Sequence, residues 1–319
     1  MSDMSIIDPQ LFDPAAIDPE TAVFNARIEK ELSNQPLLYT FEPQTIRDAR
    51  AAGHSIFGPI KRLDEARDRV VAGPAGDIPI RVFMPKEIKG IYMHIHGGGF
   101  MLGTADQHDE LLDGISKSCQ VAVVSVGYRL APENPYPAAP DDCEAVAVWL
   151  AENSSSEFGS NKLVIGGESA GANLSVVTLL RMRDRHDFTQ FSGAILTYGG
   201  YDLSMTPSAR QWGERYLILT TKIIEWFHEN YAPAEKFLDP DVSPLYADLS
   251  RMPPALFTVG TLDPLLDDSL FMHKRWQAVG KTSELAVYPG GIHAFNFFPI
   301  GLAHKANARI NEFITRAVG

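Results

Sequence analysis

Residues 163–171 read Leu163-Val164-Ile165-Gly166-Gly167-Glu168-Ser169-Ala170-Gly171. The apolar start of this stretch predicts a buried strand, and residues 170–185 predict a helix. A Gly-x-Ser-x-Gly pattern between a strand and a helix indicates a turn so tight that the positions two before and two after the serine must lack bulk. The strained turn lifts the Ser169 hydroxyl clear of the sheet, where a base and a substrate can reach it. We therefore interpret Ser169 as a nucleophile rather than as an ordinary turn serine.

A glycine-rich loop follows an earlier predicted strand. The strand covers residues 90–96 and is followed by Gly97-Gly98-Gly99-Phe100. Backbone N–H groups approach a ligand oxygen closely only where no Cβ intervenes, which glycine permits. We expect the N–H groups of Gly98 and Gly99, together with that of Ala170 behind the nucleophile, to form an oxyanion hole.

An acid and a base occur further along the chain, each after a predicted strand. Asp263 follows the strand at 255–259, and His293 follows the strand at 284–288. The carboxyl ends of parallel strands meet at one edge of a sheet, so both side chains would lie near Ser169. We predict the catalytic triad Ser169, Asp263 and His293, in which His293 is a general base rather than a surface loop histidine.

Three other carboxylates compete with Asp263. Asp267 and Asp268 fall in the first turn of the following predicted helix, where the helix dipole favours negative charge. Asp202 follows the predicted strand 193–198, and we interpret it as a hinge residue of the stretch that begins there.

The chain resembles the bacterial branch, family IV, of the hormone-sensitive-lipase family of serine esterases. The resemblance rests on sequence blocks around the candidate site and on short blocks between them. These blocks are 96–100, 128–133 with 137–139, 167–174, 243–245, 253–254, 263–265 with 267–268, and 291–295. Two positions depart from the family: Ala294 stands where glycine is more frequent, and Glu168 stands where Asp or Thr is most frequent.

The resemblance implies an α/β-hydrolase fold, which is a mostly parallel eight-stranded sheet with helices on both faces and a helical cap. The alternation of strand and helix patterns after residue 61 independently predicts a mostly parallel sheet. The predicted strands are 68–72, 78–84, 90–96, 121–128, 162–166, 193–198, 255–259 and 284–288. The predicted helices are 109–118, 141–152, 170–185, 220–231, 264–278 and 301–318, and the run 154–156 predicts a loop.

The same resemblance divides the chain. Residues 1–60 and the aromatic-rich stretch 200–234 would pack together as the two parts of the cap, and residues 61–199 and 235–319 would form the catalytic domain. Substrate would contact side chains beside the motifs and within the second cap segment. We expect these to be Phe100, Glu168, Tyr201, Trp212, Ile292 and Phe295.

The implied function is that of a serine carboxylesterase for short- to medium-chain acyl esters, and it needs no cofactor. Asp263 would hold the His293 ring in the tautomer that accepts the Ser169 proton, and His293 would then protonate the leaving alcohol. The same triad is open to lactones, amides, formamides and acetylated drugs or sugars. A receptor on this scaffold that only binds a small molecule is the alternative from another class, and the presence of His293 argues against it.

Composition limits partners and location. The net charge of −12 provides no basic field for nucleic acid or an acidic membrane. No apolar run approaches the ~18 residues of a membrane span, and residues 1–10 have no signal-peptide pattern, so we expect a cytoplasmic protein. Cys119 and Cys143 predict buried free thiols rather than a disulfide framework.

Two further features bear on metals and assembly. His94 and His96 share one side of a predicted strand, but no third ligand stands at a suitable spacing, so we expect no metal. The family resemblance also implies a possible homodimer through the last strand and helix, at about residues 284–318.

Overall fold

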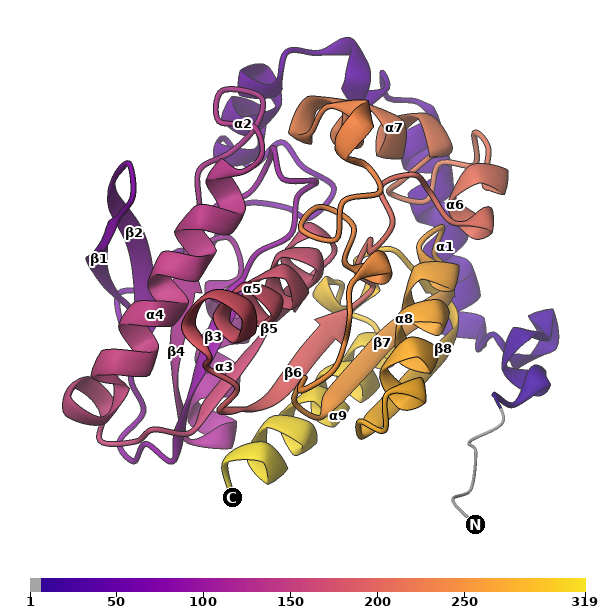
Figure 1. Cartoon of the computed structure of the whole chain (residues 1–319). Helices are drawn as coiled ribbons and strands as arrows, with labels where there is room; N and C mark the ends of the chain where they lie inside the picture. The colour runs from indigo at the N-terminus through magenta and orange to yellow at the C-terminus, as the bar shows by residue number, and fades with distance from the viewer. Residues whose placement is uncertain (1–6) are drawn as a thin grey trace.

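The computed structural model describes residues 7–319, and its centre is one eight-stranded sheet (Figure 1). The first six residues of the predicted cap segment 1–60 lie outside the described residues. The strands are β1 (Arg67–Gly73), β2 (Gly76–Phe83), β3 (Gly90–Ile95), β4 (Val121–Val126), β5 (Leu163–Glu168), β6 (Phe191–Thr197), β7 (Ala255–Leu262) and β8 (Ser283–Ile292). Their order is β1-β2-β4-β3-β5-β6-β7-β8. β2 is antiparallel to β1 and β4, and the other neighbours are parallel, which confirms the predicted sheet.

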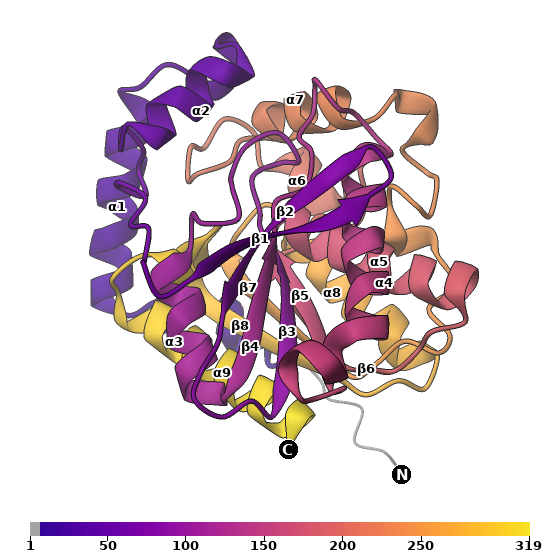
Figure 2. The same cartoon turned by 90° about the vertical axis from the view of Figure 1, so that its left-hand side faces the viewer.

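Long helices cover both faces of the sheet (Figure 2). The helices α3 (Asp109–Cys119) and α9 (Gly301–Val318) contact each other on one face. The other face carries α4 (Ala138–Phe158), α5 (Ala170–His186) and α8 (Leu266–Ala278). Successive side chains of a strand point to opposite faces. In β3, accordingly, Tyr92 packs in one core with Phe313 of α9, and Met93 packs in the other core with Val146 of α4.

Helix α4 is longer than the predicted segment 141–152. It begins at Ala138, because Pro140 falls in the first turn, where a missing N–H group costs no helical hydrogen bond. It continues through residues 154–156, so the prediction of a loop there was wrong. Ser154 and Phe158 are buried against the protein, and Gly159, at φ +73°, ends the helix.

The two predicted cap segments lie beyond the carboxyl ends of the parallel strands and along one side of the sheet. The first contains α1 (Pro19–Ser33), η3 (Leu38–Thr40) and α2 (Pro43–Ala51), and the second contains α6 (Pro207–Gln211) and α7 (Thr221–Tyr231). Helices α2 and α7 lie at the top in Figure 1, and α7 contacts η3. Helix α1 instead packs against β8 and α9, and Asn25 Nδ2 donates a hydrogen bond to Gly290 O at 2.8 Å. The short helix α6 was not predicted.

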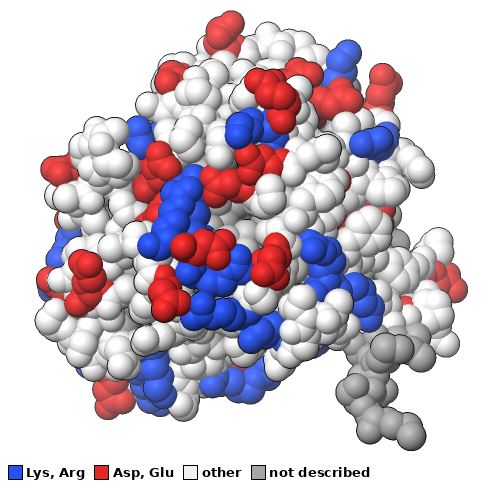
Figure 3. Space-filling model, in the orientation of Figure 1, with Lys and Arg blue, Asp and Glu red and all other residues white. Residues whose placement is uncertain are grey.

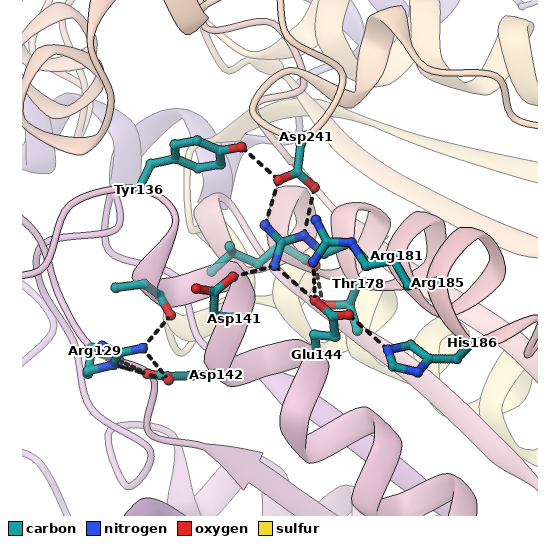
Figure 4. Close-up of polar contacts among 12 residues, drawn as sticks. Arg129, Tyr136, Asp141, Asp142, Glu144, Thr178, Arg181, Arg185, His186 and Asp241 are labelled. Carbon is teal, nitrogen blue, oxygen red and sulfur yellow. Dashed lines mark hydrogen bonds and ion pairs between the residues drawn. The ribbon is translucent and has the colours of Figure 1, made fainter. Parts of the chain in front are cut away.

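A buried ion-pair network ties α5 to its surroundings (Figure 4). Arg181 of α5 donates to Asp241 at 2.7 Å, to Asp141 of α4 at 2.8 Å and to Glu144 of α4 at 3.0 Å. Tyr136 donates to the same Asp241 carboxylate at 2.8 Å. The helix that follows the candidate nucleophile is therefore fixed to α4 and to the loop before β7.

The outside of the molecule has a mixed charge pattern. On the face shown in Figure 3, Lys and Arg side chains lie among Asp and Glu side chains rather than in one basic area. Within residues 7–319, every helix is too short or too polar to cross a bilayer. Cys119 and Cys143 are buried free thiols.

Candidate active site

Ser169 occupies a strained turn between β5 and α5. Its backbone has φ +55° and ψ −120°, which places a non-glycine residue in a region that L-residues avoid. The turn runs against the end of β3. A Cβ atom on Gly167 or on Gly171 would collide with the Ile95 carbonyl oxygen, so both positions require glycine. The turn therefore has the tight geometry that the sequence pattern predicts.

The three predicted triad side chains meet at the carboxyl ends of β5, β7 and β8. His293 Nε2 lies 3.0 Å from Ser169 Oγ. His293 Nδ1 lies 2.9 Å and 3.2 Å from the two carboxylate oxygens of Asp263, which also accepts a hydrogen bond from Leu265 N at 2.9 Å. Asp263 is 1% exposed and His293 5% exposed, so water hardly competes for these bonds. This order lets Nδ1–H donate to Asp263 and leaves Nε2 free to accept the Ser169 proton.

The competing carboxylates bind elsewhere. Asp267 accepts a hydrogen bond from Ser208 N, and Asp202 accepts bonds from Ser204 and from Tyr246. Asp268 accepts bonds from the N–H groups of residues 201 and 202 and from the Thr206 hydroxyl. These contacts hold the base of the second predicted cap segment, and they leave Asp263 as the carboxylate that contacts His293.

The glycine-rich loop turns its backbone toward Ser169. Gly98 has φ +124° and Gly99 has φ +61°, which glycine adopts without steric cost. A Cβ atom on Gly99 would collide with the Phe227 ring. Within the described residues, the N–H groups of Gly98, Gly99 and Ala170 donate to no protein acceptor. These three donors are thus available to an oxyanion beside Ser169.

Side chains from several elements fix this loop. The Tyr128 hydroxyl donates to His96 O at 2.9 Å, and the two rings stack with centroids 4.3 Å apart. Arg47 of α2 donates to Met101 O at 2.8 Å and forms an ion pair with Glu133 at 2.8 Å. The block 128–133, one of the blocks on which the family resemblance rests, therefore supports the glycine-rich loop.

A large cavity of about 570 Å³ opens over Ser169. Beyond Ser169, His293 and the glycine-rich loop, its wall includes the segment 296–299 after His293, the start of α3 with His108, and, at the end of the first predicted cap segment, residues 55 and 57–61. The cavity is much larger than the space that a small ester occupies. It therefore accommodates a substrate with one bulky half.

A second, small cavity of about 40 Å³ also reaches Ser169. Its wall is mainly apolar and includes Phe100, Leu219, Ile224, Phe227 and Leu265. His293 lines the large cavity but not this one.

Of the six predicted substrate-contacting residues, Phe100 lines the small cavity and Glu168 lines the large one. The other four, which are Tyr201, Trp212, Ile292 and Phe295, line neither cavity. Tyr201, Ile292 and Phe295 are fully buried in the core. The Trp212 indole N–H donates to Arg215 O at 2.7 Å and to Leu219 O at 3.1 Å, within the second cap segment itself.

His94 of β3 and His96, which directly follows the strand, have protein partners. His94 lies 3.0 Å from Ser125 Oγ through Nδ1 and 3.0 Å from Glu168 Oε2 through Nε2. His96 Nδ1 lies 2.9 Å from Gly97 O, and burial lowers the pKa of His96 to about 4. Among residues 7–319, no three His, Cys, Asp or Glu side chains lie together as a metal site would require.

Several wall residues were not predicted from the sequence. Phe227 and Ile224 occupy successive turns of α7, and their helical spacing indicates only a buried face. His108 and Arg50 reach the large cavity from elements far apart in the chain. No local pattern marks such residues, because the cavity forms only when α2, α3 and α7 come together.

Comparisons with known proteins agree with this geometry. Residues 92–297 match a family described as alpha/beta hydrolase fold. The chain is 35% identical over 278 residues to the carboxylic ester hydrolase LipN of Mycobacterium tuberculosis, covering 83% of this chain and 73% of that protein. It is 32% identical over 238 residues to the acetyl esterase of Salmonella schwarzengrund, covering 72% of each. A hyperthermophilic esterase of the archaeon Pyrobaculum calidifontis has a similar structure, with a TM-score of 0.85, 29% identity and coverage of 95% of this chain and 99% of that one. The chain belongs to the alpha/beta hydrolase fold family and is an enzyme of its hormone-sensitive-lipase branch.

Proposed function

We propose that this enzyme is a serine carboxylesterase that hydrolyses short- to medium-chain acyl esters through an acyl-enzyme on Ser169. The observation that carries the proposal is the line Ser169–His293–Asp263, with bonds of 3.0 Å and 2.9 Å, beside three backbone N–H groups that donate to no protein acceptor in the described part of the chain. The names of the relatives support the same reaction class.

The reaction follows from the positions of the atoms. His293 Nε2 accepts the Ser169 proton while Oγ attacks the ester carbonyl carbon. The N–H groups of Gly98, Gly99 and Ala170 stabilise the oxyanion, and the loss of one such donor costs about 10²–10³ in rate. His293 then protonates the departing alcohol. Water, deprotonated by the same imidazole, attacks the acyl-enzyme, releases the acid and regenerates Ser169.

The two cavities give the ester an orientation. The leaving alcohol oxygen must receive its proton from His293, so the alcohol half lies on the side of the large cavity. The acyl half then points into the small cavity between Phe100, Ile224 and Phe227. A space of about 40 Å³ favours the short end of the acyl range.

The complete triad argues against the receptor alternative, because a protein that only binds its ligand has no need of a base 3.0 Å from a strained serine. Lactone, amide, formamide and acetylated drug or sugar substrates use the same groups. Rate measurements on each of these substrate classes would distinguish them from simple esters.

We also propose that residues 1–60 and 200–234 act together as the cap over the catalytic domain, formed by 61–199 and 235–319. Supporting contacts are the pair Arg215–Glu29 at 3.1 Å, which joins the two segments, and the contact of α7 with η3. A protease that cuts within 200–234 should lower activity before it unfolds the sheet.

Location and assembly are further proposals. The two unpaired cysteines fit a reducing compartment, and we propose the cytoplasm. β8 is an edge strand whose first residues are half-buried, so we propose a homodimer through residues 284–318. Light scattering on the purified protein would measure its mass directly, and a monomer at micromolar concentration would reject the dimer.

The test of function is hydrolysis of nitrophenyl esters from acetate to palmitate, by the wild type and by Ser169→Ala in parallel. We expect turnover that favours short acyl chains and is lost in the variant, while circular dichroism stays the same. Retained turnover in the variant would show that Ser169 is not the nucleophile. A folded wild type that hydrolyses none of the esters would refute the carboxylesterase proposal.

A further inference from the structure

The wall of the large cavity contains an arginine without an acidic partner. Arg50 lies at the end of α2 and lines the cavity that opens over Ser169. Within the described residues, no carboxylate lies within ion-pair distance of its guanidinium group, and no acceptor forms a hydrogen bond with it. The neighbouring Arg47, on the same helix, has both kinds of partner.

The lysine and the carboxylates that line this cavity have charged or ionisable partners. Lys61 pairs with Glu110 at 3.1 Å, and the Asp109 carboxylate is paired with Arg81. Glu168 lies 3.0 Å from His94. Burial, with smaller contributions from the charges of His94, His96 and Arg50, lowers the pKa of the wall residue His108 well below its ordinary value, so it is not a cation at neutral pH.

Arg50 itself stays charged. Burial lowers the pKa of its guanidinium to about 10, well above neutral pH. Its favourable contacts are an electrostatic interaction with Tyr216 and the Phe57 ring, whose centroid lies 5.9 Å from the guanidinium carbon, at the limit of a cation–π interaction. A ring face accepts none of the five N–H bonds that guanidinium offers. These donors face the cavity and are open to an anion that enters it.

Aromatic contacts place Arg50 on the alcohol side of the scissile ester. Phe57, beneath Arg50, stacks on Phe298 with ring centroids 5.3 Å apart. Phe298 belongs to the segment that directly follows His293, the group that protonates the leaving alcohol. The small cavity, which takes the acyl half, has no charged wall residue.

We propose that the preferred substrate is a short-chain acyl ester whose alcohol half carries a carboxylate, and that Arg50 binds this carboxylate. The inference rests on the proposed carboxylesterase function and narrows its substrate class. The planar guanidinium matches a carboxylate through two parallel hydrogen bonds. One guanidinium balances the single charge of a carboxylate, whereas a phosphate monoester carries nearly two charges. With a net charge of −12, the protein as a whole does not attract anions, so selectivity depends on this local cation.

The test compares anionic esters with neutral esters of the same shape. The probes are 3-acetoxybenzoate and 4-acetoxybenzoate, which hold the carboxylate at two distances from the acetyl ester, and the methyl esters of both. The measured quantity is the ratio of kcat/KM for each acid to that for its methyl ester, normalised to their rates of alkaline hydrolysis. For the wild type we expect at least one isomer to be preferred by about tenfold or more, since bonds to charged groups have that effect.

The variants separate charge from structure. Arg50→Gln should bring the ratio of kcat/KM, acid to methyl ester, close to one. Arg50→Lys should retain part of the preference for the acid, because lysine keeps the positive charge but loses the planar pair of N–H donors. Arg47→Gln is the matched control on the same helix, and it should leave the ratio unchanged even where it lowers both rates.

Three results would overturn the proposal. They are a wild-type ratio near or below one for both isomers, an Arg50→Gln ratio equal to that of the wild type, and an equal loss of preference in Arg47→Gln. Each of them leaves the carboxylesterase function standing, provided that the methyl esters are hydrolysed. If no ester of this set is hydrolysed while the nitrophenyl esters are, only the carboxylate proposal fails.

Discussion

Asp268 provides a quantitative test of how the second cap segment is held. It lies in the first turn of α8, is 1% exposed, and accepts hydrogen bonds from Tyr201 N at 2.6 Å, Asp202 N at 3.0 Å and the Thr206 hydroxyl at 2.6 Å. Two effects oppose each other there. Burial disfavours the charged carboxylate, and the three donors favour it. Burial is the larger effect, so the pKa of Asp268 rises from 3.8 to about 7.

The consequence for stability has a definite sign. Between about pH 4 and pH 7 the folded protein holds a proton on Asp268 that the unfolded chain has lost, so the free energy of unfolding falls as the pH rises. The pKa difference of about three units, at 1.36 kcal/mol per unit, corresponds to about 4 kcal/mol over this window. Below pH 4 and above pH 7 this group contributes no further change.

Asp268→Asn isolates the effect. An asparagine accepts from the two N–H groups but does not titrate, so other pH-dependent groups cancel in the difference between the two proteins. The assay is urea unfolding of the wild type and the variant at half-unit steps from pH 4 to pH 8. We expect the wild type to lose about 4 kcal/mol relative to the variant by pH 7. A difference that stays flat with pH would show that the three donors outweigh burial and that Asp268 is ionised throughout.

Further predictions concern the triad, the anchor of α5 and the acyl cavity. Asp263→Asn should lower kcat by a factor of about 10⁴, because the amide N–H favours the wrong tautomer of His293. Asp267→Asn is the control, and a nearly unchanged kcat in the Asp263 variant would refute the assignment of Asp263 to the triad. Arg181→Met should lower the free energy of unfolding by about 2 kcal/mol, since it leaves partly buried carboxylates unpaired; thermal unfolding that matches the wild type would contradict this. Phe227→Ala should enlarge the small cavity and raise kcat/KM for hexanoate relative to acetate nitrophenyl esters by about tenfold; an unchanged acyl-length profile would assign the acyl half to the large cavity instead.

The sheet could be predicted because its central parallel strands are largely apolar runs and because strand and helix patterns alternate along the chain. The meeting of the three proposed triad side chains could be predicted for a related reason: each follows a predicted strand, and topology alone then brings Ser169, Asp263 and His293 to one edge. Helix α4 was predicted too short, because prolines and serines weaken local helix signals, whereas burial of Ser154 and Phe158 holds the extra turns.

The cavity walls could not be predicted in the same way. Ile292 and Phe295 flank His293 in the sequence, yet both point into the core, where Phe295 packs near Tyr198 and Tyr288. Nearness in sequence to a catalytic residue therefore does not indicate contact with substrate. The departure at Ala294 has a local explanation, since its φ of +63° is the conformation in which glycine is unstrained.

Helix α2 contacts both the segment of the glycine-rich loop and the large cavity, a link that the sequence did not predict. Arg47 and Arg50 are three residues apart and therefore share one side of the helix. Arg47 donates a hydrogen bond to Met101 O, next to the glycine-rich loop whose N–H groups would stabilise the oxyanion. Arg50 lines the large cavity, in which we propose that the alcohol half binds. A displacement of α2 would thus release the loop and withdraw the cation together. The geometry of the oxyanion hole and the preference for an anionic substrate would then both depend on the position of α2.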